Sequence, residues 1–146
     1  MPLGLQHCGL IVSDLERSRQ FYGEALGLPE VTRPANFTFA GAWFQVGEGQ
    51  LHLLAAADTT GAAGGPEPGP SVAVGLANHI ALEVDDLAAA VTRLGEHGVD
   101  LVGGPIPRGD GWTQVFARDP DGYVLELFEF TGEDQSDAPE RAPIRS

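Results

Sequence analysis

Two histidines with metal-binding capacity lie 72 residues apart (79 − 7) in similar apolar segments of the chain. His7 lies in QHCGLIV and His79 in NHIALEV, and the acidic residues Asp14 and Asp86 that follow keep the same offset. Several features that recur at one fixed offset indicate an internal repeat. Because imidazole is a common metal ligand, the repeat predicts that both histidines face one shared metal-binding space.

A second pair of possible ligands, His52 and Glu126, follows almost the same offset (126 − 52 = 74). Glu126 stands between two leucines in an apolar strand pattern, where a carboxylate without a partner is costly to bury. Three imidazoles and a carboxylate suit Zn²⁺, Fe²⁺, Ni²⁺, Co²⁺ or Mn²⁺, and Glu126 could also act as a general base. The predicted metal ligands are His7, His52, His79 and Glu126.

Arginine and aromatic side chains are the candidates for holding a substrate. The chain contains no lysine, so every positive side chain is an arginine, whose planar guanidinium can grip a carboxylate through two hydrogen bonds. Tryptophan and phenylalanine could wall the cavity, although such residues are also common in cores. The predicted substrate-binding residues are Arg33, Trp43, Arg108, Trp112, Phe116 and Arg118.

The hydrophobic pattern of each half predicts one strand, one helix and three more strands. In the first half we expect a helix over about 14–26, capped by Ser13 in a capping box with Glu16. In the second half we expect a helix over about 86–97, with Asp85 in the capping position. The strands are expected at 5–12, 29–33, 42–47 and 49–55, and at 78–84, 100–102, 113–118 and 123–130.

These elements predict an α+β domain made of two βαβββ modules, at 1–56 and 78–130, whose sheets form a half-barrel around a metal-binding cleft. Residues 57–77 are rich in Gly, Ala and Pro and indicate a linker. The polar segment 131–146 is typical of a disordered tail.

Composition excludes some classes of function. A net charge of −13 leaves no basic face for a nucleic acid. The amino terminus has neither a charged leader nor a long apolar run, and the single cysteine, Cys8, excludes an internal disulfide, so we expect a cytoplasmic protein. Exposed module edges favour a homodimer, with sites possible between subunits.

The chain resembles the vicinal oxygen chelate superfamily, which includes glyoxalase I, fosfomycin-resistance thiol transferases, extradiol dioxygenases and bleomycin-binding proteins. The resemblance rests on HCGLIVSDLERSRQFYGEALGL at 7–28, GAWFQVGEGQLHLL at 41–54, HIALEVDDLAAAVTRLGEHGV at 79–99 and QVFARDPDGYVLELFE at 114–129. It implies two βαβββ modules with metal ligands on the first and last strand of each, which selects the same four residues. Bacterial glyoxalase I usually has a glutamate at the place of His52.

The favoured hypothesis is a glyoxalase-like lyase or isomerase in which a divalent metal chelates adjacent oxygens of a small substrate. One alternative is a non-haem iron dioxygenase of the extradiol type, which needs only His7, His79 and Glu126. Another is a metal-free protein that binds a drug or metabolite between aromatic walls, as bleomycin-resistance proteins do.

Overall fold

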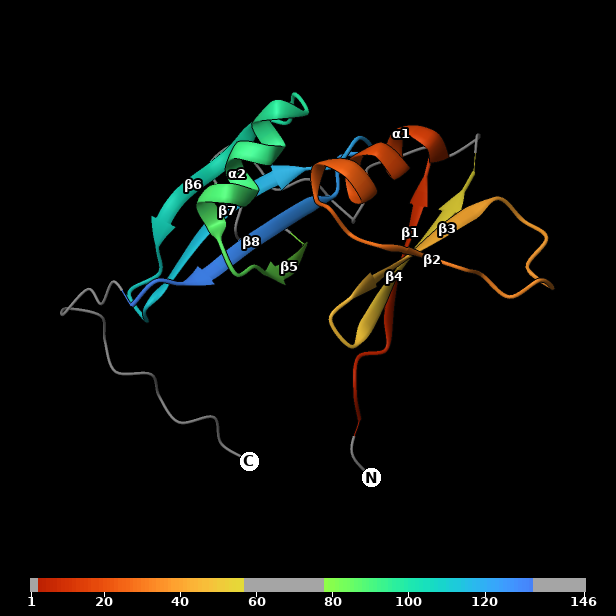
Figure 1. Ribbon diagram of the computed structural model, residues 1–146, viewed down its shortest axis with the longest axis horizontal. Coiled ribbons are helices and arrows are strands. Elements are labelled where there is room, and N and C mark those ends of the chain that lie inside the picture. Colours follow the sequence, from red (N-terminus) through yellow and green to blue (C-terminus); the bar gives the residue numbers. More distant parts are fainter. Residues whose placement is uncertain (1–2, 57–77, 133–146) are drawn as a thin grey trace.

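A computed structural model describes residues 3–56 and 78–132, and these form two βαβββ modules (Figure 1). The predicted linker, and the predicted tail beyond residue 132, lie outside the described residues. The first module consists of β1 (His7–Val12), α1 (Leu15–Arg19), η1 (Gln20–Ala25), β2 (Glu30–Val31), β3 (Gly41–Val46) and β4 (Gly49–Ala55). The second consists of β5 (His79–Glu83), α2 (Leu87–Glu96), β6 (Leu101–Pro107), β7 (Trp112–Arg118) and β8 (Val124–Phe130).

The two modules have the same sheet topology. The strand order is β1-β4-β3-β2 in the first sheet and β5-β8-β7-β6 in the second. In each module the first strand pairs in parallel with the last, and the last pairs antiparallel with its neighbour. The expected α+β fold of two βαβββ modules is therefore confirmed, while the sheets remain separate and are not closed into a barrel.

Each sheet has one face under its helix and one face turned away from it, because side chains alternate along a strand. In β4, Leu51 and Leu53 are buried in the core, while His52 between them lies on the other face, as the two-residue period of a strand requires. We call the face without a helix the open face. In the first sheet it carries His7, Ile11, Trp43, Gln50, His52 and Leu54, and in the second His79, Trp112, Phe116, Glu126 and Phe128.

Both helices begin one residue later than the sequence predicted, because Asp14 and Asp86 cap them in place of the expected Ser13 and Asp85. The Asp14 carboxylate accepts a hydrogen bond from the Arg17 backbone N–H at 3.0 Å, and Asp86 accepts one from Ala89 N–H at 2.8 Å. The Ser13 hydroxyl, expected as a cap, instead donates to Asp121 Oδ1 at 2.6 Å. Ser13 therefore ties the first helix to the second module.

The predicted helix at 14–26 changes its hydrogen-bond pattern halfway along. After α1 the chain continues as the π-helix η1, in which Leu26 N–H bonds to Phe21 O at 2.9 Å. Gly27 then takes a positive φ of 75°, which ends the helix as expected for a glycine at this position. The wider turn places Phe21 and Tyr22 in the core.

The two modules share their hydrophobic cores. Leu125 of β8 belongs to the core of the first module, and Ala25 of η1 belongs to that of the second. A buried hydrogen bond of 2.6 Å from the Tyr22 hydroxyl to Asp119 Oδ2 also joins them. Figure 1 shows the consequence: the modules lie side by side with α1 and α2 on the same side of the molecule.

The short strand expected at 100–102 is longer in the structure than predicted. Strand β6 extends to Pro107, pairs with β7, and contains irregularities of register around Gly103. This shortens the expected glycine-rich loop to about 108–111. In the part of the chain that the structure describes, no helix is long and apolar enough to span a membrane.

Candidate metal and substrate site

His7 and His52 form a stacked pair on the open face of the first sheet, which we call the histidine pair. Their ring centroids are 4.3 Å apart with planes inclined by 13°. Trp43 stacks on His52 at 3.9 Å with almost parallel planes. The register Trp43↔His52 on neighbouring strands dictates this contact, since directly paired residues share a face.

Glutamine side chains orient the histidine pair. Gln50 Oε1 lies 2.9 Å from His52 Nε2, and Gln6 Oε1 is hydrogen-bonded to His7 Nδ1. Partial burial, followed by the neighbouring His7 and Arg33, lowers the pKa of His52 from its ordinary value. A lowered pKa favours the neutral imidazole, which is the form that binds a metal ion.

His79 and Glu126 form the corresponding pair on the open face of the second sheet, which we call the acid pair. His79 Nε2 lies 3.0 Å from Glu126 Oε2. Glu126 is only 7% exposed. The contact with His79 offsets part of the cost of burying a carboxylate in an apolar strand. Phe116 is paired directly with Glu126 in the sheet and meets the His79 ring edge-on at 6.0 Å.

The structure thus brings the four predicted ligands together as two pairs. Within residues 3–56 and 78–132, no three His, Cys, Asp or Glu side chains lie together as a metal-binding group. Each pair nevertheless has donor chemistry that suits a transition ion: two imidazoles in one, an imidazole and a carboxylate in the other. A site that used all four predicted ligands would require donors from both pairs.

Of the predicted substrate-binding residues of the first module, Trp43 contacts the histidine pair and Arg33 contacts the loop beside Trp43. Arg33 donates hydrogen bonds to the carbonyl oxygens of Gly41 at 2.9 Å and Phe39 at 2.7 Å. Its guanidinium lies 4.7 Å from the Phe39 ring centroid, and Phe37 contacts Trp43 edge-on. Arg33 therefore fixes the loop that carries Phe37 and Phe39. Together with Trp43 these residues form an aromatic shelf next to His52.

Of the predicted substrate-binding residues in the second module, Trp112 and Arg118 have structural contacts of their own. Trp112 packs edge-on against Phe128 at 5.2 Å and Phe130 at 5.3 Å. Arg118 Nη1 donates to Gly122 O at 2.9 Å, in the turn before β8. Arg108 reaches the acid pair, with Nη1 3.8 Å from Glu126 Oε1.

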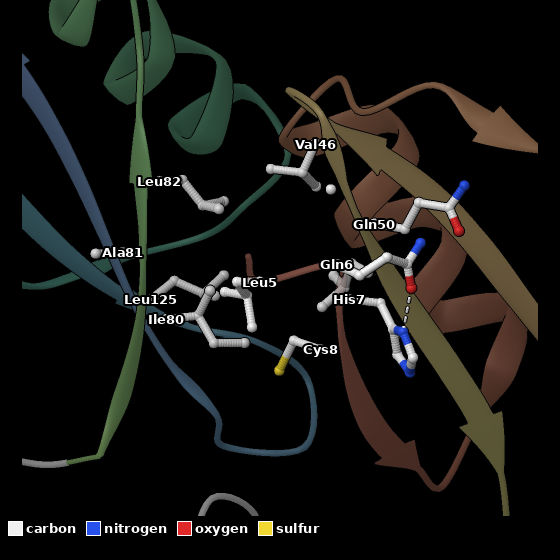
Figure 2. Close-up of a pocket in the computed structure, with 12 residues that line it drawn as sticks. Leu5, Gln6, His7, Cys8, Val46, Gln50, Ile80, Ala81, Leu82 and Leu125 are labelled. Atoms are coloured by element: carbon white, nitrogen blue, oxygen red, sulfur yellow. Dashed lines mark hydrogen bonds between the residues drawn. The ribbon is translucent and has the colours of Figure 1, made fainter. Parts of the chain in front are cut away.

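A cleft of about 190 Å³ lies between the two modules (Figure 2). Apolar side chains of β1 and β4 form one wall and those of β5 and β8 the other, and His7 lies at its border. Figure 2 shows Cys8 facing Ile80 across the cleft, whereas the His7 ring bonds to Gln6 away from it. The apolar wall includes Leu5, Cys8, Val46, Ile80, Leu82 and Leu125.

Sequence reasoning missed the two glutamines and the Tyr22–Asp119 contact. Strand periodicity places Gln50, two residues before His52, on the same face, but it does not predict the hydrogen bond between them. No local pattern pairs Tyr22 with Asp119, because the two lie 97 residues apart. Their contact follows only from the packing of the modules.

This chain belongs to the glyoxalase/bleomycin resistance protein/dioxygenase superfamily, whose family model matches residues 4–127. It is 34% identical over 127 residues to the lactoylglutathione lyase of Salmonella typhimurium, covering 86% of this chain and 91% of that protein. It is 31% identical over 127 residues to glyoxylase I 4 of Arabidopsis thaliana, covering 84% and 68% of the two chains.

The fold agrees with that of solved family members. A glyoxalase/dioxygenase from Nostoc punctiforme superposes with a TM-score of 0.71 and is 31% identical, covering 87% of this chain and 90% of that one. These similarities confirm the expected superfamily, and the relatives of this chain include proteins named as enzymes.

Proposed function

We propose that the protein is a metal-dependent lyase or isomerase of the glyoxalase type, with His7, His52, His79 and Glu126 as the metal ligands. The observation that carries the proposal is the form of the two pairs. Each consists of adjacent donors on the open face of a sheet, and Glu126 is buried against His79. Zn²⁺, Ni²⁺, Co²⁺, Fe²⁺ and Mn²⁺ all accept this mixture of nitrogen and oxygen donors.

The site is proposed to form between two copies of the chain. Bringing both pairs of one chain together would require the modules to move, and buried contacts such as Tyr22–Asp119 oppose that movement. A twofold-related copy could instead place its acid pair against the histidine pair of the first chain, which would complete two identical sites. The open faces carry the aromatic residues that such an interface would cover.

The bound ion would polarise adjacent substrate oxygens and stabilise the negative charge that develops on them. Glu126 Oε1 and Oε2 are the acceptor atoms for a proton taken from the carbon next to a carbonyl, and the same carboxyl returns it to the neighbouring carbon. In the structure His79 Nε2 lies 3.0 Å from Oε2, so the imidazole and this carboxyl are side by side. The aromatic shelf of Phe37, Phe39 and Trp43 would exclude water from one side.

For the substrate we propose a small compound with adjacent oxygens next to an acidic C–H bond. The relatives named lactoylglutathione lyase support thiol adducts of 2-oxo aldehydes as the first class to test. The free thiol of Cys8 fits a reducing compartment, and we propose the cytoplasm.

Elemental analysis and a thioester-forming assay test this function. Protein purified without chelator is expected to hold about one divalent ion per chain. Methylglyoxal with glutathione, and with other thiols, should give a thioester signal that EDTA abolishes and metal restores. Glu126→Gln should lose both activity and metal. Absence of metal from both purified and reconstituted protein would refute the proposal.

The aromatic stack favours a second candidate, a metal-free binder of an aromatic drug or metabolite. Trp43, His52 and His7 form one continuous stacked surface. Quenching of tryptophan emission by such a ligand in EDTA-treated protein, lost in Trp43→Leu, would support it. The iron dioxygenase alternative is tested by oxygen uptake with catechols after anaerobic loading with Fe²⁺.

A further inference from the structure

The Glu126 carboxylate is contacted from two sides. Oε2 faces His79, and Oε1 faces the guanidinium of Arg108 at 3.8 Å. Arg108 also contacts Asp110 Oδ2 through Nη2 at 3.3 Å, and its guanidinium lies 5.9 Å from the Phe128 ring centroid. Arg108 therefore bridges one buried and one more exposed carboxylate.

The position of Arg108 conflicts with a divalent ion at the acid pair. An ion bound by Glu126 would lie within a few ångströms of the guanidinium, and charges of the same sign repel strongly at that distance when water is partly excluded. Glu126 is buried, so screening by water is weak there. The metal and Arg108 thus compete for the same carboxylate.

We propose that the Arg108 guanidinium balances the negative charge of the Glu126 carboxylate until a metal ion displaces it from that carboxylate. The inference rests on the proposed function, because it concerns the same metal site. Once displaced from Glu126, the guanidinium is released beside the metal, where it can bind a carboxylate or other anionic group of the substrate. Arg108 is in this sense a positioning residue that couples metal binding to anion binding.

The geometry of the loop permits this movement. The backbone of Arg108 is fixed by its N–H bond to Trp112 O at 2.7 Å, so the side chain can turn while the main chain stays in place. Asp110 provides a second carboxylate that keeps the guanidinium at the site after Glu126 is taken by the metal. Glycines with positive φ on both sides of Asp110, Gly109 and Gly111, shape the tight loop.

Coupling has a measurable consequence, because two ligands that compete for or release the same group affect each other's affinity equally. An anion that draws Arg108 away from Glu126 should tighten metal binding. Metal binding should in turn tighten the binding of that anion. A site in which Arg108 has only a structural role would show neither effect.

The first test is a Zn²⁺ titration against a competing chelator for wild type and three arginine variants. Arg108→Gln is expected to bind Zn²⁺ about tenfold more tightly or better, whereas Arg108→Lys, which keeps the charge, should stay within a few fold of wild type. Arg19→Gln is the matched control, because it removes an arginine from the exposed Arg19–Glu30 ion pair. Equal or weaker binding by Arg108→Gln would overturn the inference.

The second test repeats the titration with saturating benzoate as a simple anion. Zn²⁺ affinity should rise several-fold in wild type and Arg19→Gln and stay unchanged in Arg108→Gln. A rise of the same size in Arg108→Gln would place the anion on the metal and overturn the coupling. Wild-type Zn²⁺ binding that Glu126→Gln weakens shows the proposed metal site to be intact in these comparisons. If Glu126→Gln has no effect, the proposed function itself fails, and the inference with it.

Discussion

Tyr22 and Asp119 join the two modules through a buried hydrogen bond of 2.6 Å from the phenol to Oδ2. Tyr22 is fully buried and Asp119 is 5% exposed. The other oxygen, Oδ1, accepts from the backbone N–H groups of Asp121 and Tyr123 at 2.9 Å each. One carboxylate thus organises the turn before β8 and fixes it to the π-helix of the first module.

Removing the phenol hydroxyl should destabilise the fold. In Tyr22→Phe the Asp119 carboxylate remains buried and loses a donor, and hydrogen bonds to charged groups contribute about 1.5–3 kcal/mol. We expect a loss of this size in the free energy of unfolding by urea. Tyr123→Phe is the control, since its hydroxyl donates to Ile11 O at 3.1 Å in a more exposed place. Equal losses in both variants would contradict a special role for Tyr22.

The same contact predicts a pH dependence at alkaline pH. Burial, and then the neighbouring Asp119, raise the pKa of Tyr22 well above its ordinary value near 10. The folded phenol therefore keeps its proton where the unfolded one loses it. The contribution of Tyr22 to stability is complete below pH 10 and falls as the pH rises further, by about 1.4 kcal/mol per unit.

Urea unfolding of wild type and Tyr22→Phe between about pH 8 and pH 11 measures this effect. The wild type should lose more stability over the alkaline part of the range than the variant, so the two curves converge. Parallel curves would show that Tyr22 ionises with an ordinary pKa in the folded state.

The proposed metal site predicts that the identity of residue 52 determines the Zn²⁺ affinity. If His52 is a ligand, His52→Ala should weaken Zn²⁺ affinity at least about tenfold, or 1.4 kcal/mol. His52→Glu should restore much of it, since a carboxylate also binds these ions. Chelator competition measures both. Unchanged affinity in His52→Ala would reduce the site to His7, His79 and Glu126 and favour the dioxygenase type.

Trp43 should hold the His52 imidazole in the orientation that binds metal, and its fluorescence should change when metal binds. The stack at 3.9 Å fixes the imidazole, and residues that orient metal ligands commonly contribute about 10–100-fold in affinity. Trp43→Leu should therefore weaken Zn²⁺ binding by about tenfold. Trp112→Phe, with its aromatic packing preserved, should bind normally and leave Trp43 as a fluorescence probe. No change in its emission on Zn²⁺ addition would place the ion elsewhere.

Repeat spacing predicted the modules and the faces of their strands, because duplication and the two-residue period of a strand are local features of the sequence. The two-residue period alone is enough to place His52 on the face opposite to Leu51 and Leu53. The start of the first helix was misplaced by one residue, because Ser13 and Asp14 are both good caps and the Ser13 hydroxyl instead bonds to Asp121 of the distant module.

The relation between the two ligand pairs could not be predicted in the same way. The offsets assign His7 and His79 to equivalent places in their sheets, yet they say nothing of how the sheets pack. That packing depends on long-range contacts such as Leu125 in the first core and Asp119 on Tyr22. Arg108 reaches Glu126 only because β6 and β7 extend to a short loop beside it.

Mixing two complementary variants tests the proposed shared metal site most directly. One variant carries His7→Ala and His52→Ala, and the other His79→Ala and Glu126→Gln, so neither can form a complete site alone. After unfolding and refolding together, mixed dimers should regain one intact site each, measured as protein-bound Zn²⁺ in the dimer fraction of a sizing column. Recovery in the mixture but in neither variant alone is the predicted result. A wild type that binds Zn²⁺ as a monomer, or a mixture without recovered metal, would contradict the account.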